Sequence, residues 1–175
     1  VGLQIVRFIN EPISATIAYE FMNQEFIEDD ENTKRNILVF DLGAGTLDIS
    51  FIQANRDNYK ILAFDGDPFL GGRDWDNCLY QYVTNELKKM YSYKQFTPQI
   101  EAKIRQKCEI AKINLSETSS FTIVIEGNEE KDDMKFQITR EKFYSITNNL
   151  FKRCTIPIEK VLKAADLAHN DIDNL

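Results

Sequence analysis

Cysteine, histidine and proline are scarce in this chain of 175 residues, and it has no long apolar run. Its three cysteines, Cys78, Cys108 and Cys154, are odd in number, lie far apart and lack the spacing of metal ligands, which argues against a disulfide framework and a zinc site. A reducing compartment fits this usage best. No apolar stretch approaches the ~20 residues of a membrane span, and no basic-then-apolar leader is present. The chain starts at Val1 rather than Met, which indicates a piece of a longer protein.

Basic side chains are outnumbered, with 21 Lys and Arg against 28 Asp and Glu and a formal charge of -7. This balance argues against nucleic acid or an anionic membrane as the main partner, because both would be repelled over most of the surface. Hydrophobic residues make up 43% of the chain, which is enough for a folded core. We therefore expect a globular protein with no nucleic-acid and no membrane partner.

The first third of the chain has the pattern of strands around one helix. Residues 3–9 are short, apolar and β-branched, which predicts a largely buried strand. Asn10 and Pro12 are typical of a helix start, and Ile13, Ile17 and Phe21 space the apolar face of that helix. Three further apolar segments separated by turns predict an antiparallel meander; they are residues 37–40, 47–52 and 59–64.

The remainder is mainly helical. Trp75, Leu79, Val83 and Leu87 recur at helical spacing, and Thr97 before Pro98 predicts the start of the next helix. A hairpin is expected from residues 121–126 and 134–138, followed by a helical stretch that begins at 139 and a last helix over about 157–168. A composition shift over 65–72 indicates either a hinge between two lobes or an ordinary loop.

The most informative segment runs from Asp41 to Asp48. A buried strand ends in a carboxylate, the chain turns through Gly43, Ala44 and Gly45, and a second strand begins after Thr46. Glycines let several backbone amides point at one anion, as phosphate-binding turns require, and Thr46 adds a hydroxyl donor. Asp41 and Asp48 would flank that anion, where a divalent or monovalent cation could neutralise the carboxylates and the phosphates together.

A plain hairpin with solvated aspartates is the alternative. The Gly-x-Gly pattern alone favours this alternative, because such turns are common. The longer pattern Asp-Leu-Gly-x-Gly-Thr-x-Asp between two buried strands is more specific and favours a phosphate site.

Four motifs occur in this chain in the order and at the separations found in one family. They are Asn10-Glu11-Pro12, Phe40 to Asp48, Gly66 to Asn77, and Cys108 to Ser116. In these motifs the sequence resembles the seventy-kilodalton heat-shock chaperones of the DnaK type, and the resemblance covers essentially the whole chain.

The resemblance implies an α/β protein with the actin-like ATPase fold, which is ribonuclease H-like, and within it the second lobe of the nucleotide-binding domain only. Residues 1–66 and 148–175 would form the lower subdomain, and residues 67–147 would form an α+β upper subdomain. The other lobe and the peptide-binding domain have no counterpart in this sequence, so hydrolysis by the chain alone is not expected.

Site roles follow from the resemblance, residue by residue. Gly43, Ala44, Gly45 and Thr46 would hold the phosphates of ATP or ADP. Asp41 resembles the carboxylate near Mg²⁺ and the attacking water, and Glu11 one near the γ-phosphate. Asp48 resembles a carboxylate that helps to bind K⁺. Ala44 replaces a usual glycine, which would weaken binding by ~1 kcal/mol if this position required a positive φ or a very close approach of phosphate.

Glu109, Lys112 and Ser116 form one polar stripe on a predicted helix, and spacing alone favours a solvated face with an ion pair between the first two. The resemblance implies instead that this stripe contacts the ribose and the adenine edge, with Ile113 covering the base. Cys108 lies on the opposite, apolar stripe and is expected to pack in the core.

Partners are likewise implied by the resemblance. They are unfolded polypeptides, a J-domain co-chaperone that contacts Arg7, and a nucleotide exchange factor. The expected compartment is the cytoplasm, with the endoplasmic reticulum or an organelle as the alternative. Ala44 and Ile113 also fit a divergent exchange factor or scaffold that binds nucleotide with weak or no hydrolysis. A sugar kinase or an actin-like filament protein shares the turn but not the Asn-Glu-Pro and Leu-Gly-Gly motifs.

Overall fold

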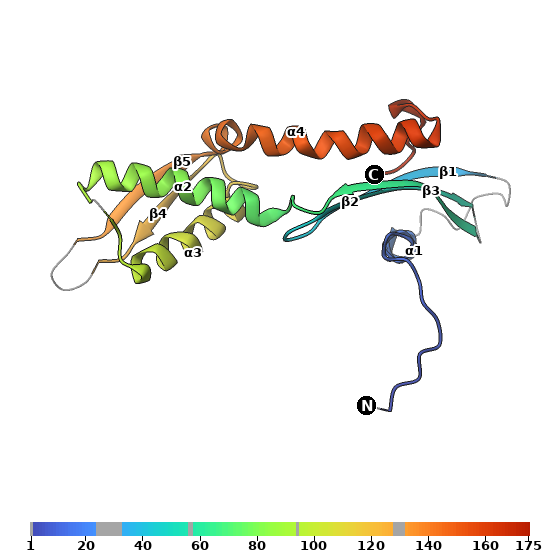
Figure 1. The fold of residues 1–175 in the computed structure, drawn as a ribbon, viewed down its shortest axis with the longest axis horizontal. Helices are drawn as coiled ribbons and strands as arrows, with labels where there is room; N and C mark the ends of the chain where they lie inside the picture. The colour runs from blue at the N-terminus through green and yellow to red at the C-terminus, as the bar shows by residue number, and fades with distance from the viewer. Residues whose placement is uncertain (1, 24–32, 56–57, 94, 128–131) are drawn as a thin grey trace. The chain divides into compact units, whose positions relative to one another are not determined.

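A computed structural model describes residues 2–23, 33–55, 58–93, 95–127 and 132–175. Within it the chain forms two compact units, the first from residues 1–69 and 154–175 and the second from residues 70–153 (Figure 1). The division between Phe69 and Leu70 falls inside the segment where composition shifts. Both units combine helices with a small antiparallel sheet. No helix among the described residues is long and apolar enough to cross a membrane.

The first unit is built on a three-stranded antiparallel sheet in the order β1 (Arg35–Leu42), β2 (Leu47–Asn55) and β3 (Asn58–Asp67). This arrangement confirms the predicted meander. Leu47, Ile49 and Phe51 alternate along β2 and are fully buried on one face of the sheet. Asp48 and Ser50 lie between them and therefore point to the other face, which carries the candidate site.

Helix α1 (Glu11–Asn23) packs on the same face as Asp48, toward the far end of the strands. Its Ile13 contacts a buried cluster that consists of Ile37, Ile52 and Ala54. The helix was expected, but its predicted apolar face is buried only in part, because Phe21 is 86% exposed. The apolar contact near Ile13 fixes the N-terminal turn of α1, and so Glu11, over the sheet.

Residues 2–10 form no strand, and Leu3, Val6 and Phe8 are each more than four-fifths exposed. The prediction of a buried strand over residues 3–9 is therefore wrong for this chain. A strand needs a neighbour for its amides and carbonyls, and the sheet β1-β2-β3 does not extend to these residues.

The second unit contains α2 (Gly72–Met90), α3 (Pro98–Asn114) and a hairpin of β4 (Ser120–Ile125) with β5 (Met134–Thr139). The predicted helical spacing in α2 is confirmed, since Trp75, Leu79, Val83 and Leu87 are all buried. The Thr97 hydroxyl accepts a hydrogen bond from the amide of Ile100 and caps α3 as expected.

Helix α4 (Arg140–Ala165) is continuous, whereas two helices were expected on either side of Pro157. Proline inside a helix removes one backbone hydrogen bond, which usually bends or ends the helix. Here Leu150, Cys154, Pro157 and Val161 follow one another at helical spacing and are all buried, so burial keeps the helix intact. A 3-10 helix (His169–Asp171) follows.

The last residues return to the first sheet. The amide of Leu38 donates to the carbonyl of Asn174 at 2.9 Å, and the amide of Asn36 donates to the carboxylate of Asp173 at 2.7 Å. Ile37 and Asn174 form an isolated parallel bridge. These bonds attach the C-terminal segment to the outer edge of β1.

Candidate functional site

The turn between β1 and β2 presents a row of unused backbone donors. The amide of Gly43 donates to the carbonyl of Thr46 at 2.9 Å and closes the turn. The amides of Ala44, Gly45 and Thr46 have no acceptor among the described residues, and all three residues are exposed. The Thr46 hydroxyl is also without a partner in the described part of the chain. Successive free amides at a turn are suited to binding an anion.

The conformation of this turn does not require glycine at position 44. Among the described residues only Gly2, Ser92 and Asp166 have a positive φ, so Ala44 adopts its conformation without strain. A Cβ atom added to Gly45 would meet no atom within 4 Å. The expected conformational penalty at Ala44 is therefore not present, and the small residues leave open space above the free amides.

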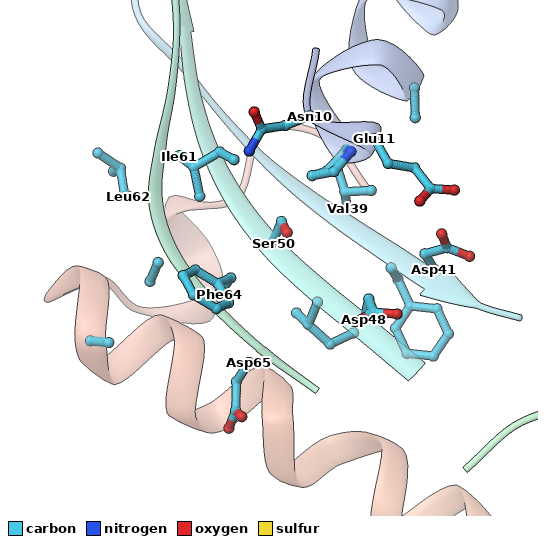
Figure 2. A pocket seen from close by; sticks show the side chains of 16 residues that line it. Asn10, Glu11, Val39, Asp41, Asp48, Ser50, Ile61, Leu62, Phe64 and Asp65 are labelled. Atoms are coloured by element: carbon cyan, nitrogen blue, oxygen red, sulfur yellow. The ribbon is translucent and has the colours of Figure 1, made fainter. Parts of the chain in front are cut away.

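Three carboxylates lie beside the turn. Asp41 and Asp48 are directly opposite one another in the register of β1 and β2. Figure 2 shows the side chains of Glu11 and Asp41 directed toward one another, with Asp48 beside Asp41 on the neighbouring strand. All three line an open cavity of about 1000 Å³, and none forms an ion pair with a described residue. The structure thus brings together the acidic residues that were predicted to surround a phosphate and its cation.

Gly66 belongs to this site although the sequence reasoning gave it no role. It lies on β3 directly opposite Asp48, and a Cβ atom at this position would collide with the carbonyl oxygen of Leu47. The absence of a side chain lets β3 approach β2 and leaves space next to the Asp48 carboxylate. A glycine in the interior of a strand often marks such a close approach, and this was the available signal.

The carboxylates do not form a complete metal site by themselves. Within the described residues no group of three or more His, Cys, Asp or Glu side chains has the geometry of a metal centre. Mg²⁺ is commonly bound by one or two carboxylates, with water and phosphate oxygens supplying the remaining ligands. Asp41 and Asp48 match this mode of binding.

The predicted nucleoside stripe lies in the second unit, on and just after α3. Glu109 is exposed, Ile113 is 60% exposed, and Ser116 is exposed beyond the helix end at Asn114. Cys108 on the opposite side is fully buried, which confirms its packing role. Burial raises the pKa of the Cys108 thiol to about 12.

Lys112 does not pair with Glu109, so the ion pair predicted from their spacing is not formed and that prediction is wrong. Its ammonium lies 2.8 Å from Oδ1 and 2.9 Å from Oδ2 of Asp76, and 3.4 Å from the carbonyl oxygen of Gly72. Asp76 on α2 faces Lys112 across the helix pair, where both side chains are only about one-quarter exposed. A partly buried pair is less weakened by water than the exposed pair along α3 would be. Local spacing did not reveal Asp76.

Arg7 lies in the exposed segment that precedes α1. Its side chain forms no hydrogen bond or ion pair with a described residue. Its predicted role in co-chaperone binding stays a prediction.

Comparisons with known proteins agree on one family. A family model described as Hsp70 protein matches residues 1–175. The chain is 34% identical over 179 residues to the chaperone protein DnaK of Metamycoplasma hominis, covering 99% of this chain and 29% of that protein. It is 35% identical over 176 residues to the DnaK of Mycoplasmopsis synoviae (strain 53), covering 98% of this chain and 28% of the relative.

A plant relative is similar to the same extent. The mitochondrial heat shock 70 kDa protein of Pisum sativum is 33% identical over 179 residues, with 99% of this chain and 25% of that protein covered. The chain thus spans less than a third of the length of each of these three relatives. Because the family model matches the chain from end to end, the chain belongs to the Hsp70 family.

Proposed function

We propose that this chain is part of the ATP-binding and hydrolysing domain of a molecular chaperone, in which the nucleotide state controls the binding of unfolded polypeptides. The observation that carries the proposal is the turn from Gly43 to Thr46, where three consecutive free amides and a free hydroxyl lie beside two facing carboxylates. The amides of such a turn can donate hydrogen bonds to phosphate oxygens, while the neighbouring carboxylates hold the accompanying cation.

Within this site the roles divide by position. Gly43, Ala44, Gly45 and Thr46 bind the phosphates. Asp41 and Asp48 hold Mg²⁺ and K⁺, largely through water, and this charge compensation is what the cations supply to phosphoryl transfer. Glu11 and Asp41 point toward one another, so together they orient a water molecule for attack and accept its proton.

The stripe on α3 binds the nucleoside. Glu109 accepts hydrogen bonds from ribose hydroxyls, and Lys112 and Ser116 donate to oxygen or nitrogen atoms of the ribose and the adenine edge. Ile113 is exposed and apolar, and so covers one face of the base. This residue provides contact area without the cation–π attraction that an arginine would add.

The fold assignment is part of the same proposal. We assign the chain to the second lobe of an actin-like ATPase domain, with residues 1–66 and 148–175 as its lower subdomain and residues 67–147 as its upper subdomain. The two compact units, divided at residues 69/70 and 153/154, support this assignment because their boundaries lie near the proposed ones.

The proposed partners act mainly on surfaces outside the nucleotide site. Unfolded polypeptides bind a domain outside this sequence, a J-domain co-chaperone contacts Arg7, and an exchange factor acts on the upper subdomain. We propose the cytoplasm as the compartment, and an organelle is the second candidate because the plant relative is a mitochondrial protein. An exchange factor or scaffold without hydrolysis is less well supported, because Ala44 fits its turn without strain.

The test is ATP turnover by the full-length protein carrying Asp41→Asn. Loss of a group that positions the attacking water lowers turnover by at least about 100-fold. Asp65→Asn is the matched control, since Asp65 is on the same sheet but points toward α4 and pairs with Lys160 at 2.9 Å. Normal turnover by the Asp41 variant would refute the catalytic assignment, and turnover that is absent from the unaltered protein would favour the scaffold.

A further inference from the structure

The Asp76–Lys112 pair determines what the neighbouring Glu109 can do. Lys112 has two acidic neighbours. Glu109 lies three residues earlier on the same helix, α3, and Asp76 lies on the adjacent helix α2. Both carboxylate oxygens of Asp76 lie within 2.9 Å of the Lys112 ammonium, and the carbonyl of Gly72 lies at 3.4 Å. The lysine is therefore held on the α2 side and leaves the Glu109 carboxylate with no ion-pair partner among the described residues.

The hydrogen-bonding groups that Lys112 and Glu109 still have free are suited to binding a diol, that is, two adjacent hydroxyl groups. An ammonium group has three N–H donors. Oδ2 of Asp76 and the carbonyl of Gly72 accept hydrogen bonds from Lys112, whereas Oδ1 of Asp76 accepts none, so one donor is left for a ligand. The exposed Glu109 carboxylate, one helical turn away, can only accept hydrogen bonds. Two adjacent hydroxyl groups can donate to Glu109 and accept from Lys112 at the same time, because a hydroxyl does both.

The charge at this site also selects against anions. Asp76 neutralises Lys112, so together with Glu109 the three side chains carry one net negative charge. A phosphate ester on either hydroxyl would bring further negative charge next to Glu109 and Asp76. If Asp76 lost its charge, Lys112 would be free to pair with Glu109 at i,i+3 or to attract the phosphate.

We infer that Asp76 is a positioning residue of the nucleoside site, which holds Lys112 away from Glu109 and so makes the site select nucleotides with a free ribose diol over those phosphorylated on the 2′ or 3′ oxygen. This inference rests on the proposed function, since it requires that the α3 stripe binds the nucleoside. It adds to that function a residue on α2 and a rule for which nucleotides are rejected.

The experiment measures equilibrium binding of three nucleotides by the full-length protein. The nucleotides are ADP, 2′,3′-dideoxy-ADP and ADP phosphorylated on the 3′ oxygen. The unaltered protein is expected to bind ADP at least about tenfold more tightly than either analogue, which is the effect of one charge-assisted hydrogen bond. In Asp76→Asn the ADP affinity falls about tenfold, the dideoxy-ADP affinity is unchanged, and discrimination against the 3′-phosphate is lost.

Two further variants make the interpretation specific. Glu109→Gln should reproduce the loss of ADP affinity, and the double variant with Asp76→Asn should lose no more than either single variant, because both changes remove the same acceptor. Glu86→Gln is the matched control: Glu86 is also an acid of α2 and pairs with Lys89 at 2.7 Å on the exposed surface. It should leave all three affinities unchanged.

The outcomes separate this inference from the proposed function. Equal loss of ADP and dideoxy-ADP binding in Asp76→Asn would mean that Asp76 only supports the fold, and would overturn the inference. Additive losses in the double variant would overturn it as well. If the unaltered protein binds ADP and dideoxy-ADP equally well, the stripe does not contact the ribose, and if it binds neither, the nucleotide site itself is wrong.

Discussion

Asp41 and Asp48 face one another on adjacent strands, and this arrangement has a cost that can be measured without any nucleotide. Directly opposed side chains in an antiparallel pair have Cβ atoms about 5 Å apart, and like charges there are destabilising. Both side chains are exposed, so the dielectric constant of water applies. Coulomb's law then gives a repulsion of about 0.8 kcal/mol at about 5 Å.

Salt sets the size of the expected effect. Screening over about 5 Å leaves about 0.7 kcal/mol at 0.01 M salt, about 0.5 at 0.1 M and about 0.15 at 1 M. Either Asp41→Asn or Asp48→Asn removes the repulsion completely, because one charge is enough. Asp48→Asn should therefore stabilise β1 and β2 at low salt, and Asp41→Asn should do so at least as much, because Glu11 also points toward Asp41. The double variant should add nothing beyond Asp41→Asn.

Amide hydrogen exchange of β1 and β2 is the suitable assay, since it reports the opening of this unit separately from the other. At 0.01 M salt each single variant should exchange at least about threefold more slowly than the unaltered chain, and the difference should nearly vanish at 1 M. Asp65→Asn is the control of opposite sign, because it removes an attraction to Lys160. Faster exchange in the single variants, or effects that add in the double variant, would refute the facing geometry.

Three further outcomes follow from packing and ionisation. Cys108 is buried with its pKa raised to about 12, so iodoacetamide at pH 8 should leave Cys108 unmodified in the folded chain. Burial and then Asp74 raise the pKa of the half-buried Cys78 as well, so Cys78 should be labelled, but more slowly than a free cysteine. The pKa of Asp65 is lowered, first by its hydrogen bond with Lys160 and then by the amide of Gly66, against a smaller opposing effect of burial. Because the folded state lowers this pKa, the ionised Asp65 stabilises the fold above about pH 4, and this stabilisation is lost as the pH falls further. The unaltered chain should therefore have an unfolding free energy about 0.5 kcal/mol higher than that of Asp65→Asn at pH 7, and the difference should disappear near pH 2. Gly66→Ala forces a Cβ against a backbone carbonyl of β2 and should destabilise the first unit by about 1–3 kcal/mol in urea unfolding; an unchanged midpoint would show that β3 can move away.

Local patterns in the sequence were sufficient where the structure depends on neighbours along the chain. The alternation in β2, the helical spacing from Trp75 to Leu87 and the cap at Thr97 are each local, and each is confirmed. The turn from Asp41 to Asp48 is also local, which is why its acidic and glycine residues could be identified together.

The incorrect predictions involve partners distant in sequence. A strand over residues 3–9 requires a neighbouring strand, which the described sheets do not provide. Pro157 stays within a helix because the burial of apolar residues before and after it in α4 outweighs one lost hydrogen bond. The i,i+3 rule selected Glu109 as the partner of Lys112, but Asp76 on another helix holds the lysine instead. Such choices depend on tertiary contacts, which spacing does not report.

Phosphate binding by the free amides of Ala44, Gly45 and Thr46 can be observed at the amides themselves. The most direct measurement is the ¹⁵N–¹H resonances of these three amides in the isotope-labelled full-length protein, titrated with ADP and Mg²⁺ and, separately, with adenosine. Phosphate binding by this turn should produce large downfield shifts of all three amides with ADP and none with adenosine, which lacks phosphate. Saturating ADP that leaves these three resonances unmoved would contradict it.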